Sequence, residues 1–317
     1  MSLYLSESEV ERIVTMPLAL EAVEAAHLSH GEGTAIDFPR QRSRLPATTM
    51  HMLQGALPSE GVLGYKAYTS SREGTRFQVY LFDAANGRQL AVIDADFLGM
   101  MRTGAMGGLA AKWLAREDAS VVGVFGAGWQ ARSQIEAVCA VRQVKVVKVF
   151  ARRRDKLEAF CTEMAQLLGR EVVAATTAEE VVRGSDIVVT ITTSASPLFA
   201  AEWLGDGTHI TAAGSNSLIR RELDEATVRR ATPIVVDARA TALREAGDLL
   251  PLFEKGRLHE GQLVEIGEVM VGSRRGRRNA ADVTLFESQG MAIQDIALAA
   301  RVLRIARDRG FGTELPF

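Results

Sequence analysis

Hydrophobic and polar residues follow two different patterns along this chain of 317 residues. Apolar positions recur at helical spacing in residues 1–31, and from Asp37 the period changes to two, which is typical of strands with one exposed face. From Ala119 onwards, short apolar runs alternate with helix-length amphipathic segments. This alternation predicts an α/β fold with a doubly wound parallel sheet.

The first part of the chain is expected to be a mixed α+β domain. Residues 1–31 indicate two helices, with Ser8 and Glu11 suited to a capping box for the first and Pro17 suited to the first turn of the second. Asn86-Gly87 is a strong hairpin signal. Strands are expected at 50–53, 62–69, 77–83 and 90–93, followed by a helix to about residue 115.

The second part is expected to be a nucleotide-binding domain over residues 116–290. The last helix, Met291 to Arg309, is amphipathic and is expected to return to the first domain, which is then discontinuous over 1–115 and 291–317. In the second domain we expect strands at 121–125, 144–150, 171–174, 186–191, 209–213 and 233–236, and helices near 129–142, 154–168, 177–183, 222–230 and 238–246. Residues 247–288 are less regular.

A glycine motif follows the first strand of this second pattern. After apolar Val121 to Phe125, small residues occupy the three positions of G-x-G-x-x-G/A at Gly126, Gly128 and Ala131. The first glycine permits a tight turn, the second lets the backbone approach a pyrophosphate, and the alanine lets the helix pack on the strand. The N-terminus of that helix also attracts phosphate. The motif predicts a dinucleotide site; a tight turn without a ligand is the alternative.

The residues after the next strand indicate which dinucleotide binds. An acidic residue about 20 positions beyond the motif binds the ribose hydroxyls in NAD enzymes. Here that position is Ala151, followed by Arg152 and Arg153. A guanidinium pairs well with a 2′-phosphate, so NADP(H) is favoured over NAD(H). The alternative is that these arginines are solvated charges at a helix start.

Composition narrows the functional class further. Apolar residues make up 47% of the chain, charged residues 24%, and the net charge is −2, which argues against a nucleic-acid partner or an anionic membrane surface. No apolar run reaches about 18 residues and the N-terminus does not resemble a signal peptide. Cys139 and Cys161 are interpreted as reduced thiols of a cytoplasmic protein, and the histidines and cysteines show no metal-ligand spacing.

Three basic residues of the first domain lie in unusual places. Lys66 interrupts an apolar strand pattern, and Arg102 lies on a helix of mostly small and apolar residues. Arg42 belongs to a basic cluster before the strands. Arginines facing a cofactor would bind a substrate carboxylate, and a partly desolvated lysine would bind substrate or transfer a proton. Taken singly, each is more typical of a surface charge or a structural salt bridge.

Over nearly its whole length the chain resembles the ornithine cyclodeaminase/mu-crystallin family. The matching motifs are Arg42-Ser43-Arg44-Leu45-Pro46, Gly64-Tyr65-Lys66, Asn86-Gly87, Arg102-Thr103-Gly104-Ala105, Gly126-Ala127-Gly128-Trp129-Gln130-Ala131, Thr192-Thr193-Ser194, Gly214-Ser215-Asn216, Arg221-Glu222-Leu223, Gly267-Glu268, Ser288-Gln289-Gly290 and Gln294-Asp295. The resemblance implies a homodimer whose discontinuous domain binds substrate and forms the dimer interface, while a Rossmann domain holds the nicotinamide cofactor.

The resemblance also implies roles for individual residues. Arg42 and Arg102 would bind the substrate carboxylate, Lys66 would bind substrate beside the reacting carbon, and Gln78 stands where some members have a substrate-contacting threonine. The cofactor would be held by Gly126, Ala127, Gly128, Gln130, Ala131, Arg152, Arg153, Thr192, Thr193, Ser194 and Gly214, with Gly290 approaching the nicotinamide.

One departure from the family pattern bears on the reaction. Cyclodeaminases have a catalytic aspartate where this chain has Asn216, and an amide orients substrate or water but cannot act as a base. We therefore expect NAD(P)H-dependent reduction of a small α-imino acid, or the reverse amino-acid dehydrogenation, in which the imine nitrogen acquires its proton from Lys66 or from a water molecule held by Asn216. Two alternatives stay open: cyclodeamination of ornithine to proline with recycled NAD, and a non-catalytic protein that stores NADPH or a small ligand.

Overall fold

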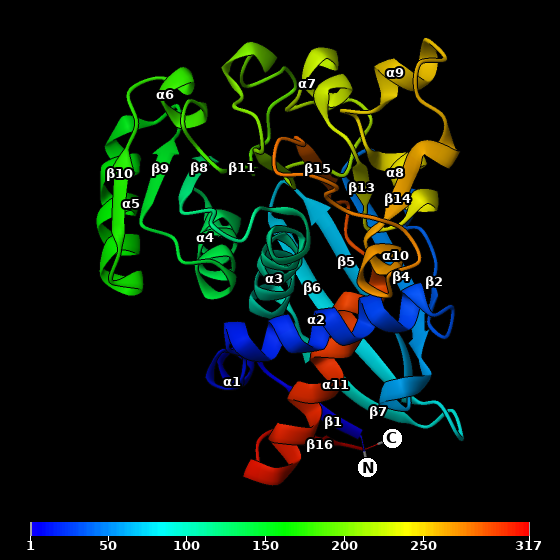
Figure 1. Ribbon diagram of the computed structural model, residues 1–317. Helices are drawn as coiled ribbons and strands as arrows, with labels where there is room; N and C mark the ends of the chain where they lie inside the picture. The colour runs from blue at the N-terminus through cyan, green and yellow to red at the C-terminus, as the bar shows by residue number, and fades with distance from the viewer. Residues whose placement is uncertain (1, 317) are drawn as a thin grey trace. The chain divides into compact units, whose positions relative to one another are not determined.

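The computed structural model describes residues 2–316, which divide into two compact units. The first unit comprises the chain up to Thr103 together with Gly290 onwards, and the second comprises Gly104–Gln289. The division falls within helix α3 (Asp96–Leu114), earlier than the expected boundary at residue 115, at the end of that helix. Each unit is built on its own eight-stranded sheet (Figure 1).

The sheet of the first unit is mixed. Its order is β16-β1-β7-β6-β5-β4-β2, with β3 paired to β4. The strands β4 to β7 form an antiparallel meander, and the Asn86-Gly87 turn between the last two confirms the expected hairpin. The bounds are β1 (Ser2–Leu5), β2 (Ile36–Asp37), β3 (Gln41–Arg44), β4 (Thr48–Leu57), β5 (Val62–Ser71), β6 (Gly74–Asp83), β7 (Gln89–Asp94) and β16 (Thr313–Leu315).

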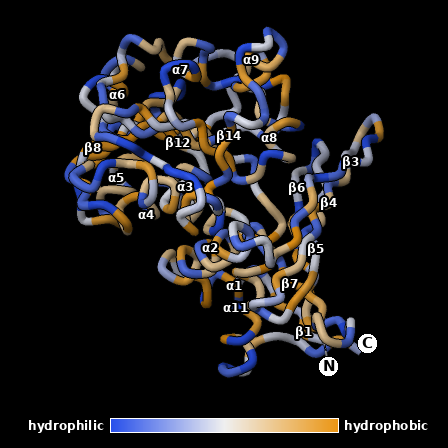
Figure 2. Tube along the Cα trace, turned by 45° about the vertical axis from the view of Figure 1, so that its right-hand side comes forward, coloured by the Kyte–Doolittle hydropathy of each residue, from blue (hydrophilic) through white to orange (hydrophobic). Residues whose placement is uncertain are grey.

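The two faces of this sheet have different environments. Helices α11 (Ala292–Arg309) and α2 (Met16–Gly31) pack together, and α11 also lies against β4 and β5. Leu53 and Val79 are fully buried, whereas Met50 and Leu63 on the opposite face are 43% and 39% exposed. Hydrophobic and hydrophilic residues follow one another along these strands (Figure 2). One face is therefore the core of the unit, and the other is an uncovered surface of the chain.

Two expectations for the N-terminal segment are corrected. Residues 2–5 form a strand rather than part of a helix, because Leu3 to Leu5 pair with β7 and tertiary pairing outweighs local helix propensity. Helix α1 (Glu7–Ile13) begins with a capping box of Ser6 and Glu9, two residues earlier than expected. The second helix begins as expected, with Pro17 in its first turn.

The sheet of the second unit confirms the expected doubly wound α/β fold. All eight strands are parallel, in the order β10-β9-β8-β11-β12-β15-β13-β14. The bounds are β8 (Val121–Phe125), β9 (Val146–Phe150), β10 (Glu171–Ala174), β11 (Ile187–Thr190), β12 (His209–Ala212), β13 (Ile234–Val236), β14 (Leu263–Glu265) and β15 (Thr284–Glu287). Ile187 and Val189 belong to one apolar core and Val188 to the other, so helices cover both faces.

The helices of this unit mostly match the expected segments. One core packs α4 (Trp129–Val141) and α5 (Arg154–Leu168), and the other packs α6 (Ala178–Val182), α7 (Glu225–Arg230), α8 (Arg239–Glu245) and α9 (Leu250–Glu254). The less regular stretch contains α9, β14 and α10 (Ile266–Met270), elements too short to give a clear periodic signal.

Three further observations concern residues 2–316. No helix in this range has the length and apolarity needed to cross a membrane, and no three acidic, cysteine or histidine side chains gather as metal ligands. Cys139 and Cys161 are buried and unbridged, and burial raises the pKa of each thiol to about 11. Both thiols are therefore protonated and unreactive near neutral pH.

Candidate active site

The glycine motif forms a tight turn between β8 and α4. Gly126 has φ +117°, and a Cβ there would lie 2.6 Å from the Ile191 carbonyl oxygen, so the fold itself requires glycine. Gly128 is the N-cap of α4, and a Cβ there would meet nothing within 4 Å. The protein's own packing gives no reason for glycine at that position, whereas a phosphate lying on the backbone would. Ala131 is fully buried against the sheet.

The same turn has a second feature that fits a dinucleotide. The side-chain oxygen of Gln130 is buried without a hydrogen-bond partner among the described residues, and as an acceptor it suits a ribose hydroxyl of the dinucleotide rather than a phosphate oxygen. Gln130 belongs to the first turn of a 13-residue helix, whose N-terminal N–H groups favour an anion. Gly126 to Ala131 thus fit the pyrophosphate of a nicotinamide dinucleotide, with Ala127 part of the turn.

The arginines expected to select the cofactor lie beside this turn. The backbone N–H of Gly126 donates to the carbonyl of Phe150 at the end of β9, 2.9 Å away. Ala151 follows, and then Arg152 and Arg153, both exposed. The first carboxylate after this strand is Asp155, inside the first turn of α5. In the structure, Ala151 at the position of the ribose-binding acid is therefore followed by two cationic side chains.

The other expected cofactor residues lie on the loops after β11 and β12, at the carboxyl edge of the sheet. Thr192, Thr193 and Ser194 follow β11, and Gly214 follows β12. Asn216 is exposed in this second loop, between Ser215 and Ser217, which share hydroxyl-to-backbone hydrogen bonds. Ligands of open parallel sheets bind at this edge, as the sequence analysis expects.

In the first unit, Lys66 is a buried cation on the core face of β5. Its side chain is 3% exposed, and its Nζ lies 2.9 and 2.8 Å from Oδ1 and Oδ2 of Asp295 on α11. The Nε of Arg102, on α3, lies 3.0 Å from Oδ1 of the same carboxylate. Asp295 is fully buried, so one carboxylate holds two cations that sequence analysis predicts to contact substrate.

Two more residues of this buried group fix Arg102. Its Nη1 donates to Oε1 of Gln294, 2.9 Å away, and Nε2 of Gln294 lies 3.0 Å from Nε2 of His27 on α2. Burial lowers the pKa of His27 to about 3, with His30 adding to the effect, so the ring is neutral and accepts from the amide. We refer to Lys66, Arg102, Asp295, Gln294 and His27 as the Lys66 cluster.

Gly290 contacts the same cluster. It has φ +85°, and a Cβ there would lie 2.8 Å from Nη1 of Arg102. The positive φ favours glycine there, and a Cβ would also displace the guanidinium of Arg102. The expected approach of Gly290 to a nicotinamide stays a prediction.

The environment of Lys66 tunes its proton affinity. Burial and the charge of Arg102 lower the pKa of Lys66 to about 7, while Asp295 opposes them. An ammonium with this pKa gives up its proton and regains it near neutral pH, as a general acid and base must.

Arg42 lies on the same face of the sheet as Lys66. Strand register places Arg42, His51, Tyr68 and Phe77 in one row across β3, β4, β5 and β6. Residues 66 and 68 of β5 point to the same side, and the His51 ring stacks on Tyr68 with centroids 4.2 Å apart. Burial, and then the charge of Arg42, lowers the pKa of His51 to about 4. His51 is thus a neutral residue of this face that the sequence analysis missed.

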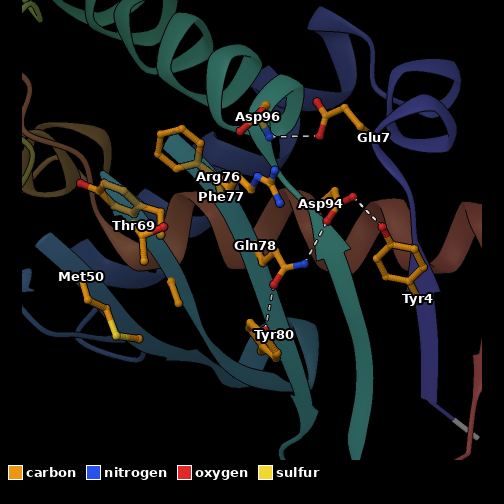
Figure 3. Close-up of a pocket in the computed structure, with 12 residues that line it drawn as sticks. Tyr4, Glu7, Met50, Thr69, Arg76, Phe77, Gln78, Tyr80, Asp94 and Asp96 are labelled. Atoms are coloured by element: carbon orange, nitrogen blue, oxygen red, sulfur yellow. Dashed lines mark hydrogen bonds between the residues drawn. The ribbon is translucent and has the colours of Figure 1, made fainter. Parts of the chain in front are cut away.

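The structure does not bring Gln78 together with Lys66, and the expected contact of Gln78 with substrate stays a prediction. Gln78 pairs with Ala67, the neighbour of Lys66, and successive strand residues point to opposite faces. Its amide donates to Asp94 at 3.1 Å and accepts from the Tyr80 hydroxyl at 2.9 Å (Figure 3). These residues line a cavity of about 660 Å³.

Comparison with known proteins places this chain in a family. Residues 2–309 match the model of the ornithine cyclodeaminase/mu-crystallin family. The Δ1-pyrroline-2-carboxylate reductase of Thermococcus litoralis, solved with NADH and L-proline, is 33% identical, with a TM-score of 0.94 over 99% of this chain and 100% of that one.

Two other solved structures are equally similar. The iminosuccinate reductase of Paracoccus denitrificans, solved with NAD⁺, is 30% identical, with a TM-score of 0.94 over 100% of this chain and 99% of that one. An archaeal alanine dehydrogenase dimer with bound NAD is 33% identical, with the same TM-score and coverage. The chain belongs to the ornithine cyclodeaminase/mu-crystallin family.

Proposed function

We propose that this protein is an NAD(P)H-dependent oxidoreductase that reduces the C=N bond of a small α-imino acid or oxidises the matching amino acid. The observation that carries the proposal is the buried Lys66, whose pKa of about 7 and contact with Asp295 suit proton transfer. The names of three similar proteins agree, since each is a reductase of an imino acid or a dehydrogenase of an amino acid.

Each residue of the proposed site has a separate role in this reaction. Bound nicotinamide supplies the hydride to the imine carbon. The Lys66 ammonium donates the proton that the nitrogen gains, so that C=N becomes CH–NH, and in the reverse direction neutral Lys66 accepts that proton. Arg42 and Arg102 bind the substrate carboxylate, as a guanidinium does through paired hydrogen bonds.

Asn216 favours simple reduction over cyclodeamination. Cyclodeamination needs a group that takes and returns protons several times, and an amide has no proton affinity in the accessible range. We propose that Asn216 orients the substrate or a water molecule. Ornithine is therefore expected to yield neither proline nor ammonia.

Absorbance at 340 nm tests the function. Purified protein is mixed with NADPH or NADH and a panel of cyclic and linear α-imino acids, and ornithine with NAD⁺ serves as the comparison reaction with ammonia as its readout. The proposal expects oxidation of reduced cofactor with at least one imino acid. Oxidation of neither cofactor across the panel would overturn it, and ammonia from ornithine would show a cyclodeaminase.

Within that function, we propose a preference for NADP(H). The solved relatives hold NADH or NAD⁺, but here the exposed Arg152 and Arg153 suit a 2′-phosphate. Replacing both with alanine is expected to raise the KM for NADPH about tenfold or more, because one or two charged hydrogen bonds to the 2′-phosphate are lost. The KM for NADH, which has no 2′-phosphate, is expected to change less than about twofold in the same variant.

A control for the loss of an exposed positive charge accompanies the double variant. Arg183→Ala removes an exposed arginine of the same unit, one that pairs with Glu179, and is expected to leave both KM values unchanged. Equal rises for NADPH and NADH in the double variant would show that Arg152 and Arg153 do not bind a 2′-phosphate.

We further propose that a second copy of the chain covers the uncovered sheet face of the first unit. Met50 and Leu63 are exposed there, and Tyr65 stacks on Tyr80 with ring centroids 4.7 Å apart. The archaeal alanine dehydrogenase is a dimer.

Light scattering tests this proposal and is expected to give a mass of two chains. Tyr65→Glu is expected to lower the measured mass towards that of one chain, because it places a charge in an apolar interface. Leu243→Glu, at an exposed leucine of α8, is the control; a monomeric wild type would refute the proposal.

A further inference from the structure

One carboxylate joins the two loops at the carboxyl edge of the parallel sheet. Glu222 is 1% exposed. Its Oε1 accepts hydrogen bonds from the backbone N–H of Thr192 at 2.7 Å and from the Thr192 hydroxyl at 2.6 Å. Its Oε2 accepts from the Gly214 N–H and the Thr190 hydroxyl, both at 2.9 Å. Three donors from two loops and one from the end of β11 therefore converge on one side chain.

The four donors suit an ionised acceptor. Burial raises the pKa of Glu222 above its usual value, and the hydrogen bonds from Thr192 and Thr190 oppose that rise without cancelling it. A carboxylate accepts from all four donors as they stand, whereas a carboxylic acid would need one of the threonine hydroxyls to turn and accept. Hydrogen bonds to an ionised group are also the stronger kind.

The backbone around Glu222 is shaped to hold this arrangement. A Cβ at Gly214 would overlap Oε2 of Glu222 and the Thr192 carbonyl oxygen, so only glycine lets the carboxylate lie against the chain. Oδ1 of Asp248 in turn accepts from the backbone N–H of Glu222 at 2.6 Å and of Leu223 at 2.7 Å. The position of the Glu222 side chain is thus set from both ends.

We propose that Glu222 is a positioning residue for the nicotinamide cofactor, holding the loops after β11 and β12 in the conformation that binds it. The inference rests on the proposed function, in which Thr192 to Ser194 and Gly214 line the cofactor. In this proposal Glu222 acts through the two loops and not by contact with the cofactor. It acts by fixing two backbone N–H groups, one in each loop, that would otherwise turn towards water.

Glu222→Gln tests this without removing volume. An amide keeps one acceptor oxygen and replaces the other with an NH₂ donor. In either orientation, that donor faces the N–H of Thr192 or that of Gly214, so one loop is released. The KM and Kd for NADPH are expected to rise about tenfold or more, as loss of a charged hydrogen bond does, while the KM for the imino acid changes little.

Asp186→Asn is the matched control. Asp186 also holds backbone, accepting from the N–H groups of Ser120 and Val121 at 2.8 and 2.9 Å, but at the amino edge of the same sheet. Its change is expected to lower the melting temperature about as much as Glu222→Gln does and to leave the Kd for NADPH, followed by nicotinamide fluorescence, unchanged.

The outcomes separate the inference from the proposed function. Wild-type protein that binds neither NADPH nor NADH would refute the function. Wild-type binding with an unchanged Kd in a folded Glu222→Gln would overturn the inference alone, and so would an equal rise in Asp186→Asn. If Glu222→Gln does not fold, Thr190→Val removes one of the four donors from a buried strand end; it is expected to raise the Kd about threefold, and no change would count against the proposal.

Discussion

Replacing Lys66 with methionine is expected to lower kcat for imine reduction about 10²- to 10⁴-fold, the usual contribution of a general acid. Methionine has nearly the length of lysine but no proton to give. The fold is expected to persist, since Arg102 stays beside Asp295 at 3.0 Å. Turnover is measured at 340 nm with saturating cofactor and imino acid, and folding by circular dichroism.

The pH profile supplies the control for this variant. Lys66 has a pKa of about 7, so the ammonium is lost as pH rises through that value. In the wild type, kcat/KM for reduction is therefore expected to fall above about pH 7, and that for amino-acid oxidation, which needs the neutral amine, to rise over the same range. Lys66→Arg, which stays charged, should lack this limb. If Lys66→Met keeps more than about a tenth of the wild-type activity, Lys66 does not act as the general acid.

Local sequence rules predicted the second unit well. The turn from β8 to α4 depends on residues within one stretch, and a positive φ at Gly126 follows from the motif alone. Buried parallel strands also read as apolar runs, because both faces are covered. The expected strands at 121–125 and 171–174 are β8 and β10 with the same bounds, and the others differ by one or two residues at an end.

The Lys66 cluster required the fold. Lys66 and Asp295 are 229 positions apart, and nothing local shows that β5 and α11 lie together. The sequence did contain one sign, since Gln294 and Asp295 interrupt an otherwise apolar helix face, where buried polar residues need partners. Their role was not assigned, because the partner on another element was unknown.

Strand register explains the other differences. The sequence showed that Gln78 belongs to a strand, but only pairing with Ala67 shows that it faces away from Lys66. His51 was overlooked for the same reason, since its stacking on Tyr68 depends on how β4 pairs with β5. A shift of one residue would exchange these faces, and no local pattern in β4 fixes the register.

Changing Asp295 to asparagine is expected to have the second large effect, on both activity and stability. The amide leaves the buried cations Lys66 and Arg102 without their shared anion, and breaking a buried ion pair costs about 3–5 kcal/mol of unfolding free energy. The kcat/KM for reduction is expected to fall about 10²-fold, because the proton of Lys66 is no longer held in place. This is the lower end of what a general acid contributes.

The direction of the pH shift separates positioning of Lys66 from a merely structural loss. Asp295 raises the pKa of Lys66 against the effect of burial, so without the carboxylate that pKa falls and the limb of the reduction profile moves below pH 7. Asp94→Asn is the control, because Asp94 accepts from Tyr4 at 2.7 Å and from Gln78 on the opposite face of the same sheet; it should leave the limb in place.

A double-variant cycle completes the test of Asp295. If this carboxylate acts through Lys66, Asp295→Asn should lower kcat far less in the Lys66→Met background than in the wild type, because the proton it positions is already absent. Additive losses, or an unshifted pH limb in a folded Asp295→Asn, would show that Asp295 stabilises the fold without tuning the lysine. Denaturant unfolding of the four proteins measures the stability part separately, so that a loss of folded protein is not mistaken for a loss of catalysis.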